Sequence, residues 1–241
     1  MKYLLLLMTL AATPVLAGPE LNIGSLYEYL DGQRSTSLKR VYNGGDRTAF
    51  VKVMVAELVY GPDGKATEVA MDGLPSDQRA LVASPARLIV PASGMQQVRL
   101  LYRGERDRER YFRLRFIPVL PEANDDFGLT NEEAQQYDES LSAGVNILAG
   151  YGAVVFVKPT QTRYSTQVLQ DVGRFSIPNN GNATVVIDHF NDCSANGKDC
   201  KTPTKHHILP NRTLKFDKQP GRTYRFVLLE GQERRDVEFS G

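Results

Sequence analysis

The stretch VNILAGYGAVVFVKP, residues 145–159, lies in the middle of the chain and decides how the rest is interpreted. Its second part, residues 154–157, is continuously apolar, as in a strand that is buried on both faces. A strand of about 14 residues is long, since most have about 3 to 10. The first part is therefore predicted to extend beyond its own domain and to offer apolar side chains and unpaired backbone groups to another chain. Its alternation puts four residues on one side of the strand, namely Val145, Ile147, Ala149 and Tyr151.

The first 17 residues, MKYLLLLMTLAATPVLA, have the features of a secretory signal peptide. A lysine at position 2 precedes an apolar run, and the run leads to the small-residue cleavage pattern Val15-Leu16-Ala17. The apolar run is too short to cross a bilayer. We therefore expect export, cleavage after residue 17 and a soluble mature chain that begins near Gly18.

Charge and length narrow the possible functions. The chain has 29 Lys and Arg against 28 Asp and Glu, and loss of Lys2 with the signal leaves the mature chain without net charge. A neutral balance gives no electrostatic argument for nucleic acid or for a membrane surface. The mature chain of about 224 residues is long enough for two domains.

The only two cysteines, Cys193 and Cys200, lie close together in a chain expected to be exported. An oxidising compartment allows such a pair to form a stable disulfide. A zinc site would need two further ligands, which His189, His206 and His207 could supply, but the spacing fits no common zinc pattern. We predict a disulfide that closes one local loop, and neither a metal nor another cofactor.

Short apolar or alternating segments, separated by Gly, Pro, Asn and Asp turns, recur on both sides of the central stretch. A turn signal about every 8 to 12 residues is typical of an antiparallel sandwich. The sequence predicts an all-β chain of two domains, residues 18–159 and 160–241. The expected strands are 21–30, 37–42, 49–60, 81–84, 87–90, 95–102, 110–117, 145–159, 167–169, 174–177, 184–190, 206–209, 212–216, 222–229 and 233–239.

Two polar connections interrupt this pattern. Residues 103–109, RGERDRE, are almost wholly charged, and we expect a solvated hairpin loop there. Residues 118–144 form a long acidic connection, and loops of this length are uncommon unless they are functional or disordered. Its apolar side chains predict either a docking surface or a short helix over residues 131–142.

The sequence contains no recognisable catalytic machinery. There is no G-x-S-x-G, H-E-x-x-H or phosphate-loop motif, and none of the three histidines lies in a catalytic pattern. Asp188 and His189 are adjacent in an expected strand, which sends their side chains to opposite faces. We therefore do not expect an enzyme.

Basic residues that interrupt apolar strands allow two interpretations. A charge in such a position is costly unless it is paired or lies at an edge. The residues could form an ordinary solvated face, or they could line a cleft that receives the chain-terminal carboxylate of a partner. They are Lys39, Arg40, Arg113, Arg115 and Lys158.

Several segments in this order resemble the periplasmic chaperones that assemble fimbriae by the chaperone/usher route, in particular the common-pilus type and the alternate family. In the first half they are RLIVPASGMQQVRLLYRG (87–104), RYFRLRFIPV (110–119) and the long strand that ends in VKP. In the second half they are IPNNGNATVVI (177–187), the two cysteines around ANGKD, and HHILPNRTLKF (206–216). The resemblance covers essentially the whole mature chain.

This resemblance implies two immunoglobulin-like domains with a subunit-binding cleft between them. In that family, the long strand before the linker lends alternating apolar side chains to a fimbrial subunit that lacks its last strand, and the subunit then passes to an outer-membrane usher. The lending side chains here would be Val145, Ile147, Ala149 and Tyr151. The implied compartment is the Gram-negative periplasm.

The chain departs from the family at the residues that hold the carboxylate of the subunit. Many members have an arginine in the first strand and a lysine in the last strand of domain one, but those positions fall near Tyr27 and Val154 here. Lys39, Arg113 and Lys158 are the alternative candidates. A self-capping homodimer would cover the exposed strand. The rival functions are a fimbrial subunit or adhesin and an exported binding or hydrolytic module.

Overall fold

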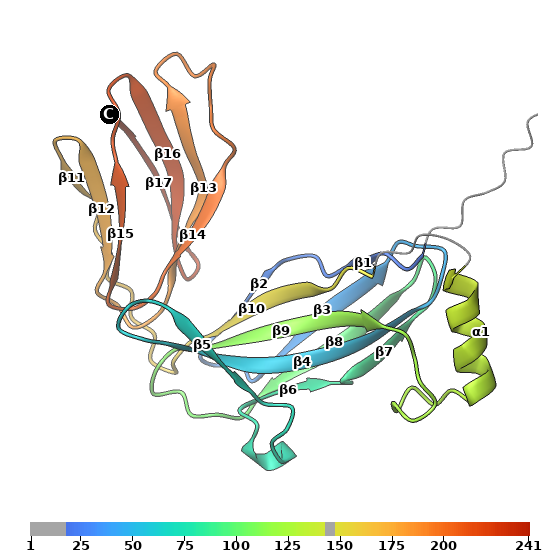
Figure 1. The fold of residues 1–241 in the computed structure, drawn as a ribbon. Coiled ribbons are helices and arrows are strands. Elements are labelled where there is room, and N and C mark those ends of the chain that lie inside the picture. Colours follow the sequence, from blue (N-terminus) through green and yellow to red (C-terminus); the bar gives the residue numbers. More distant parts are fainter. Residues whose placement is uncertain (1–17, 143–147) are drawn as a thin grey trace, which may run out of the picture.

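The computed structural model describes residues 18–142 and 148–241. Within these ranges the chain is mostly β-strand, with one α-helix, α1 (Asn131–Ser142), and one short 3-10 helix at Ser76–Gln78. Apolar side chains form two separate cores, one between residues 21 and 157 and one between residues 175 and 239. Figure 1 shows two bodies that meet at one end, so that the molecule is bent like an L. The prediction of an all-β chain with two sandwiches is confirmed.

Two sheets form the first sandwich (Figure 1), with strand orders β1-β3-β8-β6 and β2-β10-β9-β4-β5, and β7 also pairs with β4. All neighbouring strands are antiparallel except β2 and β10, which run parallel. The strands are β1 (Leu21–Asn22), β2 (Tyr27–Leu30), β3 (Thr36–Asn43), β4 (Ala49–Tyr60), β5 (Ala66–Ala70), β6 (Leu81–Ser84), β7 (Arg87–Val90), β8 (Met95–Tyr102), β9 (Arg110–Val119) and β10 (Tyr151–Val157).

Strand β9 shows why these residues form a two-layer sandwich. Phe112, Leu114 and Phe116 are fully buried in the core between the two sheets. The intervening side chains, Arg113 and Arg115 among them, lie on the outer face of the sheet and are half-buried. This period of two residues matches the alternation of side chains along a strand, so one face supplies the core and the other face stays accessible.

The strands expected at residues 21–30 and 145–159 differ most from the structure. The strand expected at residues 21–30 is split, because the chain leaves one sheet after β1 and joins the other sheet at β2. Gly24, between them, has a positive φ of 64°, a conformation that glycine adopts without steric cost. The strand expected over residues 145–159 is described only as β10, and residues 148–150 before it have no regular structure. Val145 and Ile147 lie outside the described residues.

The long acidic connection contains the predicted helix over residues 131–142 and also docks onto the first domain. Phe50 of β4 makes edge-to-face contacts with Phe127 and Tyr137, at centroid distances of 5.2 and 4.8 Å. The Tyr137 hydroxyl donates a hydrogen bond to the Thr48 carbonyl at 2.5 Å. Helix α1 is therefore held at the end of the sandwich away from the bend (Figure 1).

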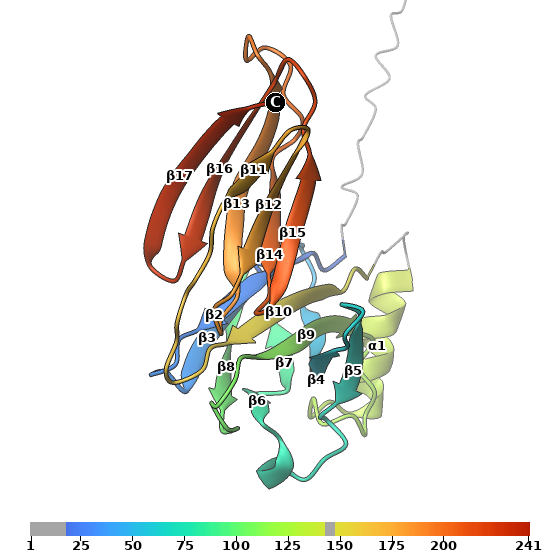
Figure 2. The same cartoon turned by 90° about the vertical axis from the view of Figure 1, so that its left-hand side faces the viewer.

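The second sandwich has strand orders β11-β12-β15 and β14-β13-β16-β17. Figure 2 shows it standing on one end of the first domain, above β2 and β10. Phe175 lies at the centre of its core and contacts several other rings. The strands are β11 (Leu169–Asp171), β12 (Arg174–Asn179), β13 (Val185–Ser194), β14 (Thr204–Ile208), β15 (Arg212–Asp217), β16 (Arg222–Glu230) and β17 (Glu233–Ser240).

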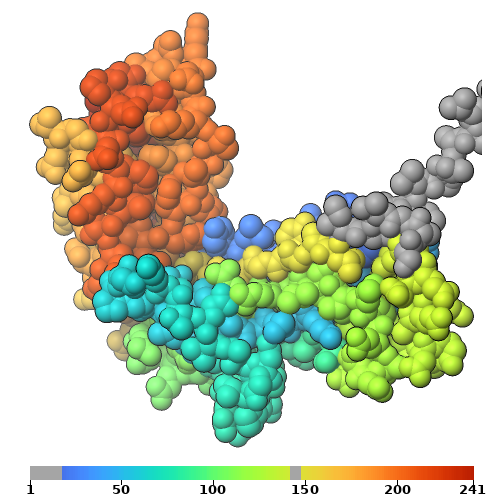
Figure 3. Space-filling view, in the orientation of Figure 1, coloured from blue at the N-terminus to red at the C-terminus, as the bar shows by residue number. Residues whose placement is uncertain are grey.

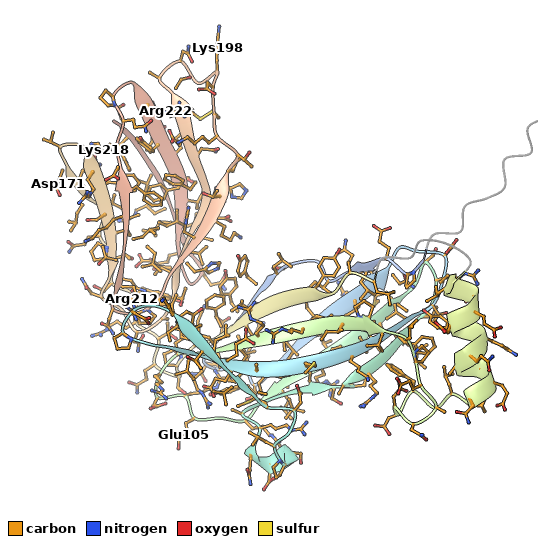
Figure 4. All side chains as sticks on the ribbon, in the orientation of Figure 1. Glu105, Asp171, Lys198, Arg212, Lys218 and Arg222 are labelled. Atoms are coloured by element: carbon orange, nitrogen blue, oxygen red, sulfur yellow. A yellow bond between two sulfur atoms is a disulfide. The ribbon has the colours of Figure 1, made fainter. Side chains whose placement is uncertain are left out.

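Cys193 and Cys200 form a disulfide, as predicted, and both sulfurs are thereby unavailable for zinc. The bond closes a loop at the end of β13. Lys198, inside this loop, lies at the tip of the second domain that is farthest from the first domain (Figure 4).

Candidate functional site

Strand β10 has one side that is only partly covered. On one edge it pairs with β9 along its whole length, from Tyr151 opposite Phe116 onward. On the other edge β2 pairs only with the second half of β10, beginning at Val154. Among the described residues, no strand covers the β2-side edge of residues 151–153. This open edge lies on the inner side of the bend, where Figure 3 shows the yellow atoms of β10 at the surface.

The backbone groups at this open edge can be assigned from the ladder. The Val154 N–H donates to the Leu26 carbonyl at 2.9 Å, which shows that Val154 directs its N–H towards the β2 side. Backbone groups two residues apart along a strand point to the same edge. Gly152 therefore directs its N–H and carbonyl groups to the open edge, and it can hydrogen-bond an incoming strand there.

The predicted row of apolar side chains continues the core face of β10. Ala153, Val155 and Val157 are buried in the core of the first domain. Tyr151 lies on the same face but is 38% exposed. Ala149 is exposed as well. The row of apolar side chains is thus buried from Ala153 onward and exposed at Tyr151 and Ala149. The part of the row at Val145 and Ile147 stays a prediction from the sequence.

The two domains meet at a cluster of rings built on the outer face of β2 and β10. The His207 ring from β14 stacks on Phe156 at 4.8 Å and lies 4.3 Å from the Tyr27 ring. Its Nε2 shares a hydrogen bond of 2.6 Å with the Tyr29 hydroxyl. Burial, followed by the nearby charge of Lys205, lowers the pKa of His207 to about 4. The imidazole is therefore neutral in neutral solution and acts as a packing group.

A buried carboxylate forms a second contact between the domains. Glu109 Oε2 accepts hydrogen bonds from the Thr184 N–H at 2.8 Å and the Thr184 hydroxyl at 2.6 Å. It also accepts a hydrogen bond from Tyr111 at 2.8 Å. Burial raises the pKa of Glu109, which these hydrogen bonds partly oppose. The expectation that residues 103–109 form only a solvated loop is therefore wrong at Glu109.

Further contacts hold the angle between the domains. Arg212 of β15 donates hydrogen bonds to the carbonyls of Gly61 and Pro62 at 2.5 and 2.7 Å. Figure 4 shows Arg212 where the base of the second domain meets the first. A cavity of about 170 Å³ lies beside this junction, lined by residues of both domains that include Tyr29, Lys158, Thr184 and Lys205.

Two of the three candidate anchors for a carboxylate are already neutralised. Lys39 Nζ is buried and pairs with Glu28 at 2.7 Å, and it also bonds the Ser25 carbonyl. Lys158 Nζ pairs with Asp31 at 2.8 Å, with 9% of the lysine side chain exposed. Burial by itself lowers the pKa of Lys158, but the interactions with Asp31 and Tyr164 together outweigh burial, and the net shift is upward. Each lysine has its acidic partner within the first domain, and Lys158 Nζ also lies 5.9 Å from the centre of the Tyr164 ring of the second domain.

The third candidate, Arg113, lies beside the open edge. It is opposite Val154 in the β9–β10 ladder, and Arg115 is opposite Gly152. Glu68 of β5 contacts Arg113 at 2.9 Å and Arg115 at 2.6 Å. The two guanidiniums thus share one carboxylate, and each side chain is more than a third exposed. Of the three candidates, Arg113 is the most accessible.

The two positions near which the resemblance leads one to expect a basic pair are direct neighbours here. Tyr27 and Val154 face each other in the β2–β10 ladder. Tyr27 belongs to the ring cluster around His207, so the place of a basic pair is taken by an aromatic and an aliphatic side chain.

Sequence reasoning missed Glu68 and the junction residues Glu109 and His207. Strand β5, which carries Glu68, follows a Gly-Pro-Asp-Gly turn directly after β4, and this turn was the available signal for a hairpin. No local pattern indicates the other two, because their partners are remote in the sequence. Among the described residues, no helix is long and apolar enough to cross a bilayer, and no group of metal-ligating side chains is present.

Known proteins are similar to this chain in sequence and in fold. No protein-family model matches the chain. The probable fimbrial chaperone EcpB of Escherichia coli O157:H7 is 27% identical over 219 residues, which cover 90% of this chain and 89% of the relative.

Solved structures share the fold. The class 5 fimbriae chaperone CfaA has a TM-score of 0.56 and 19% identity, with 91% of this chain and 98% of CfaA covered. A chain from the Salmonella enterica complex of SafA pilin with the SafB chaperone has a TM-score of 0.52 and 13% identity, with 95% and 98% covered. The chain is thus similar in sequence to a probable fimbrial chaperone, and it shares the fold of solved fimbrial chaperones.

Proposed function

We propose that this chain is a non-enzymatic periplasmic chaperone that binds a fimbrial subunit along the open edge of β10 and delivers it to an outer-membrane usher. The observation that carries the proposal is the strand edge at residues 151–153, unpaired among the described residues, with Tyr151 emerging from the core beside it. An unpaired edge of this kind is a template for another strand. The similarity to EcpB and the structure of a pilin bound to the SafB chaperone support the same class of partner.

Strand pairing and side-chain insertion would both contribute to binding. Each main-chain hydrogen bond to the subunit contributes on the order of 1 kcal/mol net and sets the register. Insertion of apolar side chains contributes roughly 25 cal/mol per Å² removed from water, less the cost of ordering the partners. Tyr151 and Ala149 belong to the inserted row, and the row continues to Ile147 and Val145 as predicted from the sequence.

The subunit carboxylate is assigned to Arg113 rather than to Lys39 or Lys158. The two lysines are held in ion pairs and are almost wholly buried, so a new anion would have to displace an existing one at both. Arg113 shares its carboxylate with Arg115 and is accessible beside the open edge. The signal peptide over residues 1–17 and the periplasmic location belong to the same proposal.

Co-expression tests the proposal. The tagged chain is produced in a periplasm with each fimbrial subunit encoded in the same genome, and bound subunit is quantified after purification. Tyr151→Asp should remove the subunit, since a charge would have to enter the apolar row. Tyr42→Asp is the matched control, because Tyr42 is a strand tyrosine of similar exposure, 42%, on the other sheet.

A second variant tests backbone pairing. Gly152→Pro removes the one N–H that points to the open edge and leaves the ladder to β9 intact. We expect a folded protein, judged by its circular dichroism spectrum, that retains little subunit. Wild-type amounts of subunit on both the Tyr151→Asp and the Gly152→Pro variants would refute binding at this edge.

A further inference from the structure

Gly152 lies at the open edge of β10 although the fold of the chain does not require a glycine there. Its backbone is not among those with positive φ. A Cβ atom added at this position would lie 3.8 Å from the Leu114 carbonyl oxygen and 3.9 Å from Arg113 Nη1, which are ordinary contacts. Glycine weakens the interior of a strand, and it often marks a place where another chain approaches closely.

The missing side chain leaves the outer face of β10 bare beside two arginines. Gly152 is opposite Arg115 in the ladder, and side chains of residues opposite each other share one face of a sheet. Arg113 and Arg115 both contact Glu68, and the described residues provide no other acidic partner for either. This cluster of two arginines and one glutamate carries one positive charge in excess.

The distance between neighbouring strands determines which side chains of a bound strand could reach the two arginines. A strand that pairs with the open edge would lie about 4.8 Å from β10 and roughly 9 to 10 Å from β9. A side chain on the outer face of the incoming strand must cross β10 to meet Arg115. At Gly152 no side chain of β10 obstructs that path, whereas a larger residue would lie between the two groups.

We propose that the strand bound at the open edge carries an acidic side chain on its outer face, and that this side chain crosses Gly152 to pair with Arg115, while Arg113 holds the subunit carboxylate. The inference rests on the proposed function and adds the chemistry of the bound subunit strand. This ion pair favours the one register of the subunit strand that places its acidic residue opposite Gly152. Glu68 occupies the arginines in the free protein.

Dissociation kinetics of the purified chaperone–subunit complex test this pairing, with the co-expressed fimbrial subunits as the probes. Arg115→Gln should speed dissociation about fivefold, as expected for the loss of a partly exposed ion pair. Gly152→Val should have at least this effect, because it obstructs the crossing. Arg225→Gln is the control, since Arg225 is an exposed strand arginine paired with Glu238 at 3.1 Å in the second domain.

Glu68→Gln provides a test of opposite sign. This substitution removes the Glu68 carboxylate, which competes with the subunit for the arginines and lies on an exposed strand. The complex should therefore dissociate about fivefold more slowly. General damage to the protein would not produce this result. The effect of Glu68→Gln should shrink when NaCl is raised from about 0.05 to about 0.5 M, because salt screens exposed charges.

The outcomes separate the inference from the proposed function. If a subunit binds and Arg115→Gln, Gly152→Val and Glu68→Gln all dissociate like Arg225→Gln, the acidic pairing is wrong and strand binding stands. If no subunit binds the wild-type chain, both are wrong. Circular dichroism and melting temperature of each free variant verify that it is folded.

Discussion

Acidification should destabilise the chain through His207, and a single variant isolates this effect. Burial lowers the pKa of His207 to about 4, whereas an unfolded histidine has a pKa of about 6.5. The stability contributed by the neutral ring is complete above about pH 6.5. It is lost progressively as the pH falls from about 6.5 towards about 4, because the unfolded chain then binds the proton more tightly.

The size of the effect follows from the two pKa values. For a fully enclosed ring, the change from pH 7 to pH 5 would cost about 2 kcal/mol. His207 is only partly buried, so water screens part of this penalty and about 1 kcal/mol remains. His207→Phe keeps a ring on Phe156 but cannot take up a proton.

Urea unfolding followed by circular dichroism at pH 7 and pH 5 measures this difference. The wild-type chain should lose about 1 kcal/mol more than His207→Phe between the two pH values. His206, whose pKa is also lowered by burial, and Glu109 are present in both proteins, so their contributions cancel. Equal losses in the two proteins would refute the assignment of the pH dependence to His207.

Three further variants test other contacts by thermal or urea unfolding. Replacing both Cys193 and Cys200 by serine should lower stability by about 2 to 3 kcal/mol, as expected for a short closed loop, and reductant should then have no further effect. Tyr137→Phe should cost about 1 kcal/mol through its lost hydrogen bond, and an unchanged midpoint would show that α1 is held by its rings alone. Thr184→Val should cost about 1 to 3 kcal/mol, because it removes a donor from buried Glu109; no loss would mean that this contact does not couple the domains.

Much of the fold could be predicted from local patterns. The strands β4, β6, β7 and β8 have the predicted bounds, since each is an apolar or alternating run closed by Gly, Pro or Asp turns. Strand β5 was missed because all five of its residues are exposed and no apolar periodicity marks it. Its position follows from pairing with β4 and not from burial.

The candidate site was less predictable than the fold. The alternation around Tyr151 predicted the face of the strand on which this side chain lies, because it depends only on the period of a strand; its role in binding stays a prediction. The ion pairs of Lys39 and Lys158 could not be predicted, because only the fold brings their partners, Glu28 and Asp31, next to them. The same is true of the junction between the domains, where His207 contacts residues far earlier in the chain.

Amide hydrogen exchange in the complex with a co-expressed fimbrial subunit tests strand binding at β10 most directly. In the free protein the Gly152 N–H points to the open edge and should exchange quickly, while the Ala153 N–H faces β9 and should be protected. Binding of the subunit should slow exchange at Gly152 at least about tenfold and leave Ala153 little changed. An equally fast exchange of Gly152 in the free and bound protein would contradict the account.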